Sequence, residues 1–253
     1  MLRQTFLHLR GIGVRTEQRL WQCGLQDWEV AISSPPPKGV GWLRWDQWRR
    51  ELEESLRALR AAEYRYFSGR VPRRFHWRAW PDFRDKVAYL DIETTGAGPW
   101  AQVTVVGVFD GVRAHTFIHG DNLDLLPEFL EQFALIVTFN GSTFDLPFLR
   151  RRFSGLEIDQ LHFDLRYALR ALGFRGGLKT IERSLGLVRE ESINGLTGED
   201  AVRLWMDYVN GDDTALELLV KYNTADVVNL EPLAEYAYEQ LWTQCRKGLE
   251  REA

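Results

Sequence analysis

Two carboxylates, Asp91 and Glu93, stand one residue apart in the stretch YLDIETTG, where the neighbouring Leu90 and Ile92 are apolar. In a β-strand, alternate side chains point to the same face, so both acids would lie side by side next to core residues. Burial and mutual repulsion disfavour two ionised carboxylates there. A divalent metal ion, which prefers hard oxygen ligands, or a bidentate arginine would neutralise them. A strand that emerges into solvent would instead leave them as ordinary exposed acids.

Two later segments carry further polar groups that suit the same chemistry. NGSTFDLPFL places Asn140 at the end of an expected strand and Asp145 directly before an expected helix. Asp145 before Leu-Pro would also serve as a helix N-cap. KYNTADVVNL places Tyr222 and Asp226 four residues apart, on one face of a helix. The alternative there is an ordinary Tyr–Asp contact on a solvated helix face.

The three motifs together resemble a known family. D-x-E in a strand, N-G-x-x-F-D-x-P-F-L, and Y-x-x-x-D in a late helix are similar to the tyrosine branch of the DEDD 3′–5′ exonuclease superfamily, with its RNase H-like fold. The second motif most resembles the proofreading domain of B-family DNA polymerases, and YprB-like predicted exonucleases show a similar pattern. The resemblance spans about residues 86–243. The histidine branch would need histidine at position 221, which is Lys221.

The resemblance implies a metal-dependent 3′→5′ exonuclease that acts on single-stranded nucleic acid with a free 3′ end, DNA favoured over RNA, and releases nucleoside 5′-monophosphates. Its two divalent cations, Mg²⁺ or Mn²⁺, would be held by Asp91, Glu93, Asp145 and Asp226. Asp91 would bridge both ions, Glu93 and Asp226 would complete one site, and Asp145 would support the other. Tyr222 would orient the attacking water, since an ordinary tyrosine pKa of about 10 makes it a poor base.

Further residues are candidate contacts to the nucleic acid. The resemblance suggests four near the catalytic acids: Thr94, Thr95, Asn140 and Phe144. Thr94 and Thr95 would equally suit a β-branched strand end. His162 and Asp164 allow a further metal ligand, but Asp164 better suits a helix N-cap, and no role is assigned to His162.

The elements that must position these residues follow an α/β pattern from residue 86 onward. We expect an RNase H-like mixed sheet of about five strands with flanking helices over residues 86–253, with the first three strands as an antiparallel meander. The β-branched and apolar runs that predict strands are 86–93, 101–111, 113–120 and 134–141. The remainder is mostly helical, including segments starting at 123 and 213.

Residues 1–34 resemble a small helix-hairpin-helix DNA-binding region. Gly11 and Gly13 would let the backbone turn tightly and present N–H groups to a phosphate, with Arg15 beside them. An αα-corner that packs on the nuclease domain is the alternative.

Residues 35–85 open within the proline-rich linker SSPPPKG (33–39) and continue as an Arg/Trp-rich helical connector. The Trp and Leu at helical spacing predict a packed face. The other arginines, with Arg150–Arg152, could form a basic rim near the active site.

Composition limits the class of protein. The 253 residues carry 32 Lys and Arg against 36 Asp and Glu, a net charge of −4, so bulk charge does not favour nucleic-acid binding. The two cysteines fit no disulfide framework, and no signal peptide or membrane span is visible. We therefore expect a cytoplasmic protein without a membrane partner. Two rival hypotheses keep the same fold: a non-catalytic nucleic-acid-binding module, and a structure-selective endonuclease.

Overall fold

A five-stranded mixed sheet forms the centre of the molecule in a computed structural model, which describes the backbone of residues 1–250 and the side chains of residues 1–246. The strand order is β3-β2-β1-β4-β5. β1, β2 and β3 form an antiparallel meander, whereas β4 and β5 run parallel to β1. The strands are β1 (Val87–Thr94), β2 (Val103–Phe109), β3 (Ala114–Ile118), β4 (Leu135–Thr138) and β5 (Leu161–Asp164).

This topology confirms the predicted RNase H-like α/β sheet and its meander. The sequence pattern missed β5 as a strand, because its four residues run directly into a helix and are too short for an alternating pattern to be recognised. The last three residues of the predicted 86–253 domain lie outside the described residues.

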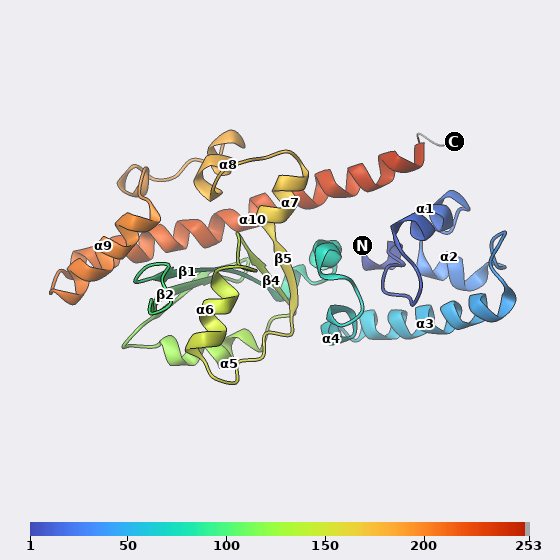
Figure 1. The fold of residues 1–253 in the computed structure, drawn as a ribbon, viewed down its shortest axis with the longest axis horizontal. Helices are drawn as coiled ribbons and strands as arrows, with labels where there is room; N and C mark the ends of the chain where they lie inside the picture. Colours follow the sequence, from blue (N-terminus) through green and yellow to red (C-terminus); the bar gives the residue numbers. More distant parts are fainter. Residues whose placement is uncertain (251–253) are drawn as a thin grey trace.

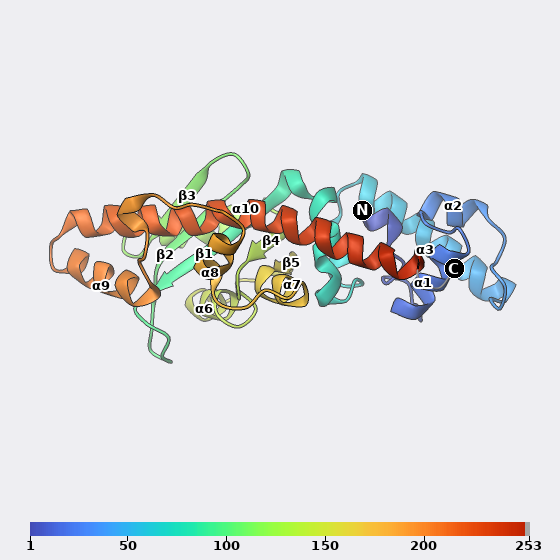
Figure 2. The same ribbon diagram turned by 90° about the horizontal axis from the view of Figure 1, so that it is seen from above.

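The long helix α10 (Asp213–Glu250) covers one face of the sheet and extends beyond it (Figures 1 and 2). α5 (Leu126–Leu130) and α6 (Asp145–Arg152) cover the opposite face (Figure 1). Three shorter helices lie on the α10 side: α7 (Leu165–Ala171), α8 (Leu178–Ser184) and α9 (Gly198–Val209). None of the described helices is both long and apolar enough to cross a membrane.

The alternation along β1 decides which face carries the acids. Ala88, Leu90 and Ile92 pack in the hydrophobic cluster beneath α5 and α6. Tyr89 packs in the cluster that includes α10. Since side chains alternate between faces, Asp91 belongs with Tyr89, and the acids of β1 point toward α10.

The N-terminal region packs against the C-terminal part of α10 (Figure 1). Its ion pair between Arg78 and Glu17, at 2.8 Å, is almost fully buried. Trp242 of α10 lies beside the Arg78 guanidinium and Trp21. The helices are α1 (Val14–Gln22), α2 (Trp28–Ser33), α3 (Trp42–Arg60) and α4 (Tyr64–Ser68), with 3₁₀ segments Leu2–Gln4 and Arg73–Asp82. One hydrophobic cluster thus joins this region to the sheet and α10.

The structure differs from the predicted helix-hairpin-helix in the first helix of the motif. Only the 3₁₀ turn Leu2–Gln4 precedes the glycine hairpin, which leads into α1 with Gly13 at its N-cap. The motif and the domain boundaries at 34 and 85 stay predictions.

Gly107 of β2 is required for the close approach of α10 to the sheet. A Cβ atom there would lie 2.1 Å from Oδ1 of Asn223 and 3.1 Å from the Val227 side chain. Gly107→Ala should therefore push α10 away and lower the free energy of unfolding by about 1–3 kcal/mol. Thermal melting checks this. Gly69→Ala, whose added methyl would meet its nearest atom at 3.7 Å, is the control, and equal melting of the two variants would contradict the prediction.

Candidate active site

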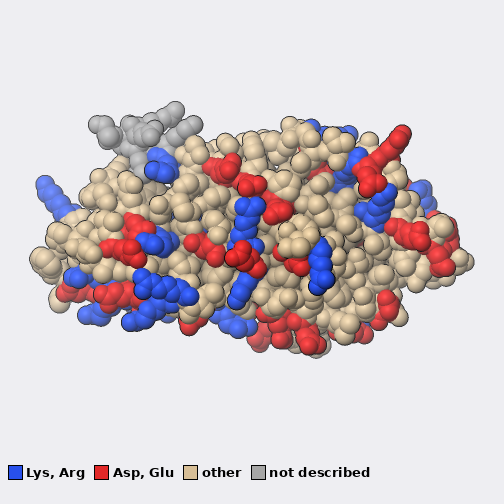
Figure 3. Space-filling view, turned by 180° about the vertical axis from the view of Figure 1, so that it is seen from behind, with Lys and Arg blue, Asp and Glu red and all other residues tan. Residues whose placement is uncertain are grey.

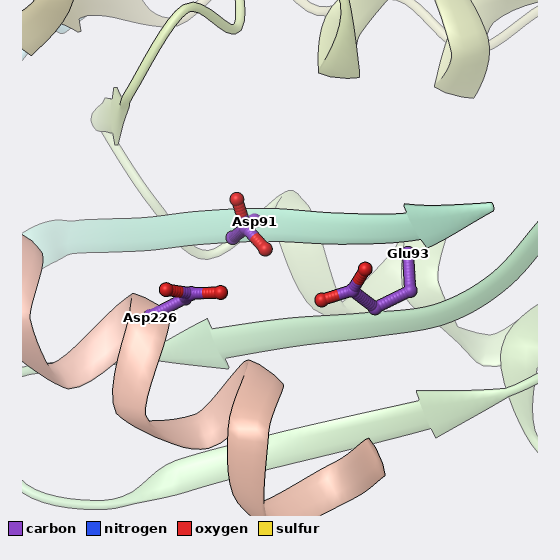
Figure 4. Close-up of side chains that lie close together, drawn as sticks. All are labelled: Asp91, Glu93 and Asp226. Carbon is purple, nitrogen blue, oxygen red and sulfur yellow. The ribbon is translucent and has the colours of Figure 1, made fainter. Parts of the chain in front are cut away.

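Three carboxylates converge between β1 and α10 (Figure 4). Asp91 and Glu93 project from the strand and Asp226 from the helix, each with one oxygen within 4.8 Å of the others. Glu93 and Asp226 are buried, and Asp91 is half-buried. The group lines a cleft of about 700 Å³ that also includes Tyr222 and Thr94. The strand spacing of two and the helix spacing of four therefore bring four predicted residues together.

Asn223, the neighbour of Tyr222, holds Asp91 in place. Its Nδ2 donates to Oδ2 of Asp91 at 3.0 Å, and the asparagine is fully buried. Asp91 pairs with Gly107 across β1 and β2, and the missing side chain at that glycine makes room for Asn223. Neither residue was singled out from the sequence, because this contact joins positions 132 residues apart.

Asp145 takes a different position from the one that its local sequence suggests. It is the first residue of α6, Phe144 is the N-cap, and no side chain caps this helix, so the N-cap interpretation was wrong. Instead, Oδ1 of Asp145 accepts a hydrogen bond from the backbone N–H of Ile92 at 3.2 Å. Asp145 is not part of the three-carboxylate group. This hydrogen bond nevertheless holds the Asp145 carboxylate against the backbone of β1 at Ile92, the residue between Asp91 and Glu93.

The acids have raised pKa values because they are buried next to one another. Burial, and then the charge of Asp226, raises the pKa of Glu93 to about 8. Burial and the charge of Asp164 raise the pKa of Asp145 to about 7, although backbone N–H donors oppose this. Burial and the neighbouring acids also raise the pKa of Asp91 well above its ordinary value. An all-oxygen, multiply acidic group of this kind could hold a hard divalent cation.

Tyr222 and Lys179 lie together at the cleft. The Nζ of Lys179 donates to the Tyr222 hydroxyl at 2.5 Å and lies 3.6 Å from Oδ1 of Asp226. Burial, together with the charges of Asp226 and Glu93, raises the pKa of Tyr222, so its hydroxyl stays protonated at neutral pH. A protonated Tyr222 hydroxyl can donate a hydrogen bond. Lys179 was missed because nothing in its local pattern distinguishes it from a surface lysine.

A buried arginine connects Asp226 to a second acid. Nη2 of Arg189 contacts Oδ1 of Asp226 at 2.5 Å and Oε1 of Glu182 at 2.6 Å, while its Nε donates to the other oxygen of Glu182 at 2.7 Å. The Arg189 and Glu182 side chains are 5% and 1% exposed. Asn229 also donates to Glu182. The arginine thus pairs with Asp226 and not with the D-x-E pair, for which an arginine partner was the alternative to a metal ion.

Of the other residues predicted to contact nucleic acid, only some line the cleft. Thr94 and Phe144 line the cleft. Thr95 does not, and its Oγ1 accepts from the N–H of Gln102. Asn140 does not line the cleft either and adopts a positive φ of 74°. The hairpin residues Gly11, Gly13 and Arg15 belong to the N-terminal region, which lies at the far end of the molecule from α9 and the cleft (Figure 1).

Asp164 and His162 support the segment that carries Asp145. Asp164 accepts from the N–H of Arg166 and caps α7, which confirms the N-cap interpretation. It also accepts from the N–H groups of Asn140 and Ser142 at 2.8 and 2.9 Å, so it stabilises the turn before α6. His162 contacts Thr138 through Nε2 at 2.9 Å, and burial lowers its pKa to about 4. Among the described residues, neither belongs to the group of side chains that could hold a metal ion together.

The raised pKa values predict how the stability of the metal-free protein depends on pH. The folded-state pKa of Glu93, about 8, and of Asp145, about 7, exceed the ordinary values of 4.5 and 3.8. The folded state therefore binds more protons, and stability should fall as pH rises from about 4.5 to about 8. Mn²⁺ should offset this loss, because the ligands bind it in their ionised form. Melting temperatures in EDTA and in Mn²⁺ across this range check both signs, and a rise with pH in EDTA would contradict them.

Comparisons with known proteins bear on the family and the fold of this chain. A profile of the RNase_H superfamily matches residues 88–238. No curated protein sequence matches the chain. Among solved structures, the family B DNA polymerase from the hyperthermophilic archaeon Pyrobaculum calidifontis is similar with a TM-score of 0.50 and 18% identity, over 59% of this chain and 24% of that chain. This chain thus spans about a quarter of that polymerase, and the likeness concerns the fold.

Two structures of NrnC from Brucella melitensis, one of them bound to pGG, are also similar. Both have a TM-score of 0.45, with 20% and 22% identity, over 68% of this chain and 83% of theirs. The family assignment rests on the superfamily profile, which matches more than half of the 253 residues and contains the whole three-carboxylate group. Together with the mixed sheet, this confirms the predicted superfamily: the chain belongs to the RNase H superfamily.

Proposed function

We propose that this RNase H-like protein is a metal-dependent 3′→5′ exonuclease. It hydrolyses phosphodiester bonds of single-stranded nucleic acid, DNA in preference to RNA, and releases nucleoside 5′-monophosphates. The observation that carries the proposal is the convergence of Asp91, Glu93 and Asp226 within 4.8 Å in a cleft that also contains Tyr222. Burial raises the pKa values of all three acids, and the charge of Asp226 raises those of Asp91 and Glu93 further, a cost that a non-catalytic module would not need to bear.

The four acids are assigned to hold the divalent ions. Asp91, Glu93 and Asp226 would supply the ligands of one ion, and Asp145, which accepts a hydrogen bond from the Ile92 N–H, would support the other. When bound, two such ions would lower the pKa of a water molecule and neutralise charge on the phosphate. Asn223 keeps the Asp91 carboxylate in one orientation through its hydrogen bond.

The remaining residues of the cleft orient the reactants. Tyr222 keeps its proton at neutral pH and can therefore donate a hydrogen bond that orients the attacking water. Lys179 is 30% exposed at the cleft, where its ammonium group can reach a phosphate oxygen while it remains beside the Tyr222 hydroxyl. Phe144 and Thr94 line the wall on which the terminal nucleotide would rest.

The N-terminal hairpin is assigned a separate, sequence-independent role. Gly11 and Gly13 would present backbone N–H groups to a phosphate, and the exposed Arg15 would add charge. This contact would favour DNA at a distance from the cleft, and it is not required for hydrolysis itself.

Digestion of 5′-labelled DNA and RNA oligonucleotides, side by side with Mg²⁺ or Mn²⁺, tests the function. A ladder that shortens from the 3′ end, and vanishes in EDTA, is the expected result. Internal cuts without a ladder would favour the endonuclease. Absence of products with both metals and both substrates would overturn the enzymatic function.

A further inference from the structure

A second concave site lies next to the catalytic cleft. This pocket, of about 660 Å³, is bounded by the 3₁₀ segment Arg73–Asp82, by β5 and α7, and by the C-terminal part of α10. The N-terminal region thus supplies one of its walls. Residues 139–146 separate it from the cleft, because Phe144 lines the cleft whereas Ser142 and Leu146 line the pocket.

The rim of this pocket carries arginines without acidic partners. Arg73, Arg74 and Arg150 all line it and are exposed. Arg150 donates to the carbonyl of Ile158 at 3.5 Å, and the Arg74 guanidinium lies over a phenylalanine ring. Within residues 1–246, none of the three lies within ion-pair distance of a carboxylate. Other arginines are paired, such as Arg152 with an aspartate at 2.6 Å.

The acid that lines the pocket is already bound. Asp164 accepts three backbone N–H groups, so its charge is directed toward the turn before α6 and the start of α7. Three guanidinium groups and one carboxylate therefore leave this site with an excess of positive charge. This contrasts with the acidic cleft, and with the face shown in Figure 3, where basic and acidic side chains are interspersed.

The walls of the pocket are mostly apolar and include aromatic rings. Phe75 and Trp77 contribute from the 3₁₀ segment, and Tyr167 of α7 is 49% exposed. An exposed aromatic ring beside cationic groups suits a flexible single strand, because bases stack on the ring while phosphates contact the arginines. A purely apolar ligand would leave the guanidinium groups without a role.

We propose that this pocket binds nucleotides of the single-stranded substrate upstream of its 3′-terminal nucleotide. The proposal rests on the exonuclease function and extends it with a second contact site. A chain of net charge −4 with a cluster of buried acids repels phosphates, and unpaired arginines one segment away from the cleft supply the missing attraction. The pocket thereby makes the affinity depend on substrate length.

The test compares substrates that can and cannot reach the pocket. The variant Arg73→Ala/Arg74→Ala/Arg150→Ala should raise KM for a DNA strand of about 12 nucleotides by about tenfold or more, with little effect on hydrolysis of a dinucleotide. Tyr167→Ala should weaken binding of the long strand roughly tenfold. Arg113→Ala, beside β3 at the opposite edge of the sheet, is the matched control and should bind and hydrolyse like the wild type. All changed side chains are exposed, so melting temperatures should be unchanged.

Binding provides a readout that does not need catalysis. In the Asp91→Asn background, fluorescence anisotropy of the labelled strand should show a salt dependence whose slope falls by about 2 in the triple variant, since each phosphate contact to a single strand contributes about 0.7. Unchanged binding of the long strand, or an equal loss for the long strand and the dinucleotide, would overturn the proposal. If the wild type cleaves nothing but binding still depends on the three arginines, the exonuclease function fails and the pocket stands.

Discussion

Replacing Asp91 by asparagine should abolish nuclease activity and at the same time stabilise the metal-free protein. Asp91 is one of the residues that would hold the ions, and loss of a single electrostatic contact in an active site already costs about 10²–10³ in rate, so kcat should fall at least about 10³-fold. The pKa of Asp91 is well above its ordinary value because of burial and the charges of Asp226, Asp145 and Glu93. Removing that charge at pH 8 relieves the repulsion, while the asparagine oxygen can still accept from Asn223.

The stabilisation is measurable by melting in EDTA. A gain of about 1 kcal/mol raises the melting temperature of a chain of this size by about 2–4 °C. Mn²⁺ should raise the melting temperature of the wild type but not of Asp91→Asn. Asp124→Asn, with a side chain 80% exposed on the α5 side, is the control. Activity within tenfold of the wild type, or a lower melting temperature in EDTA, would remove Asp91 from the metal site.

Replacing Arg189 by methionine should be among the most destabilising single changes in this chain. The arginine neutralises Glu182 and contacts Asp226, and both side chains of the Arg189–Glu182 pair are almost fully buried. Loss of one partner leaves the other charge buried and unpaired, which lowers the free energy of unfolding by about 3–5 kcal/mol. Urea unfolding measures this directly.

Two further variants separate lost charge balance from lost packing. Adding Glu182→Gln to Arg189→Met removes the unpaired charge of Glu182, so it should recover much of the stability, although Asp226 still lacks its contact with Arg189. Arg203→Met breaks an exposed pair with Asp200 and should change stability by less than about 1 kcal/mol. A loss of the same small size in Arg189→Met would show that the buried network contributes little.

The comparison of sequence and structure separates local from long-range determinants. In a strand, side chains two residues apart share a face, which brings Asp91 and Glu93 together. In a helix, side chains four residues apart share a face, which brings Tyr222 and Asp226 together. Both relations depend only on formation of the strand or the helix. For this reason the sequence was sufficient to predict the meander and four members of the cleft. The N-cap at Asp164 is likewise a local hydrogen bond, and it was predicted correctly.

Asp145 shows where local inference fails. Its sequence context suits an N-cap, but its carboxylate accepts a hydrogen bond from the backbone N–H of Ile92 in β1. The two residues are 53 positions apart, so the segment around Asp145 gives no sign of this contact. The short strand β5 is similar, because four residues give too little pattern and pairing with β4 decides their conformation.

The amino-acid sequence by itself determined which acids share a face of a strand or helix, because their spacing acts through local backbone geometry. Only the tertiary structure decided what surrounds them: the approach of Asn223 over Gly107, the Arg189–Glu182 pair, Lys179 beside Tyr222, and the arginine-rimmed pocket. These contacts join segments far apart in the chain, and their energies arise from burial, which no single segment contains.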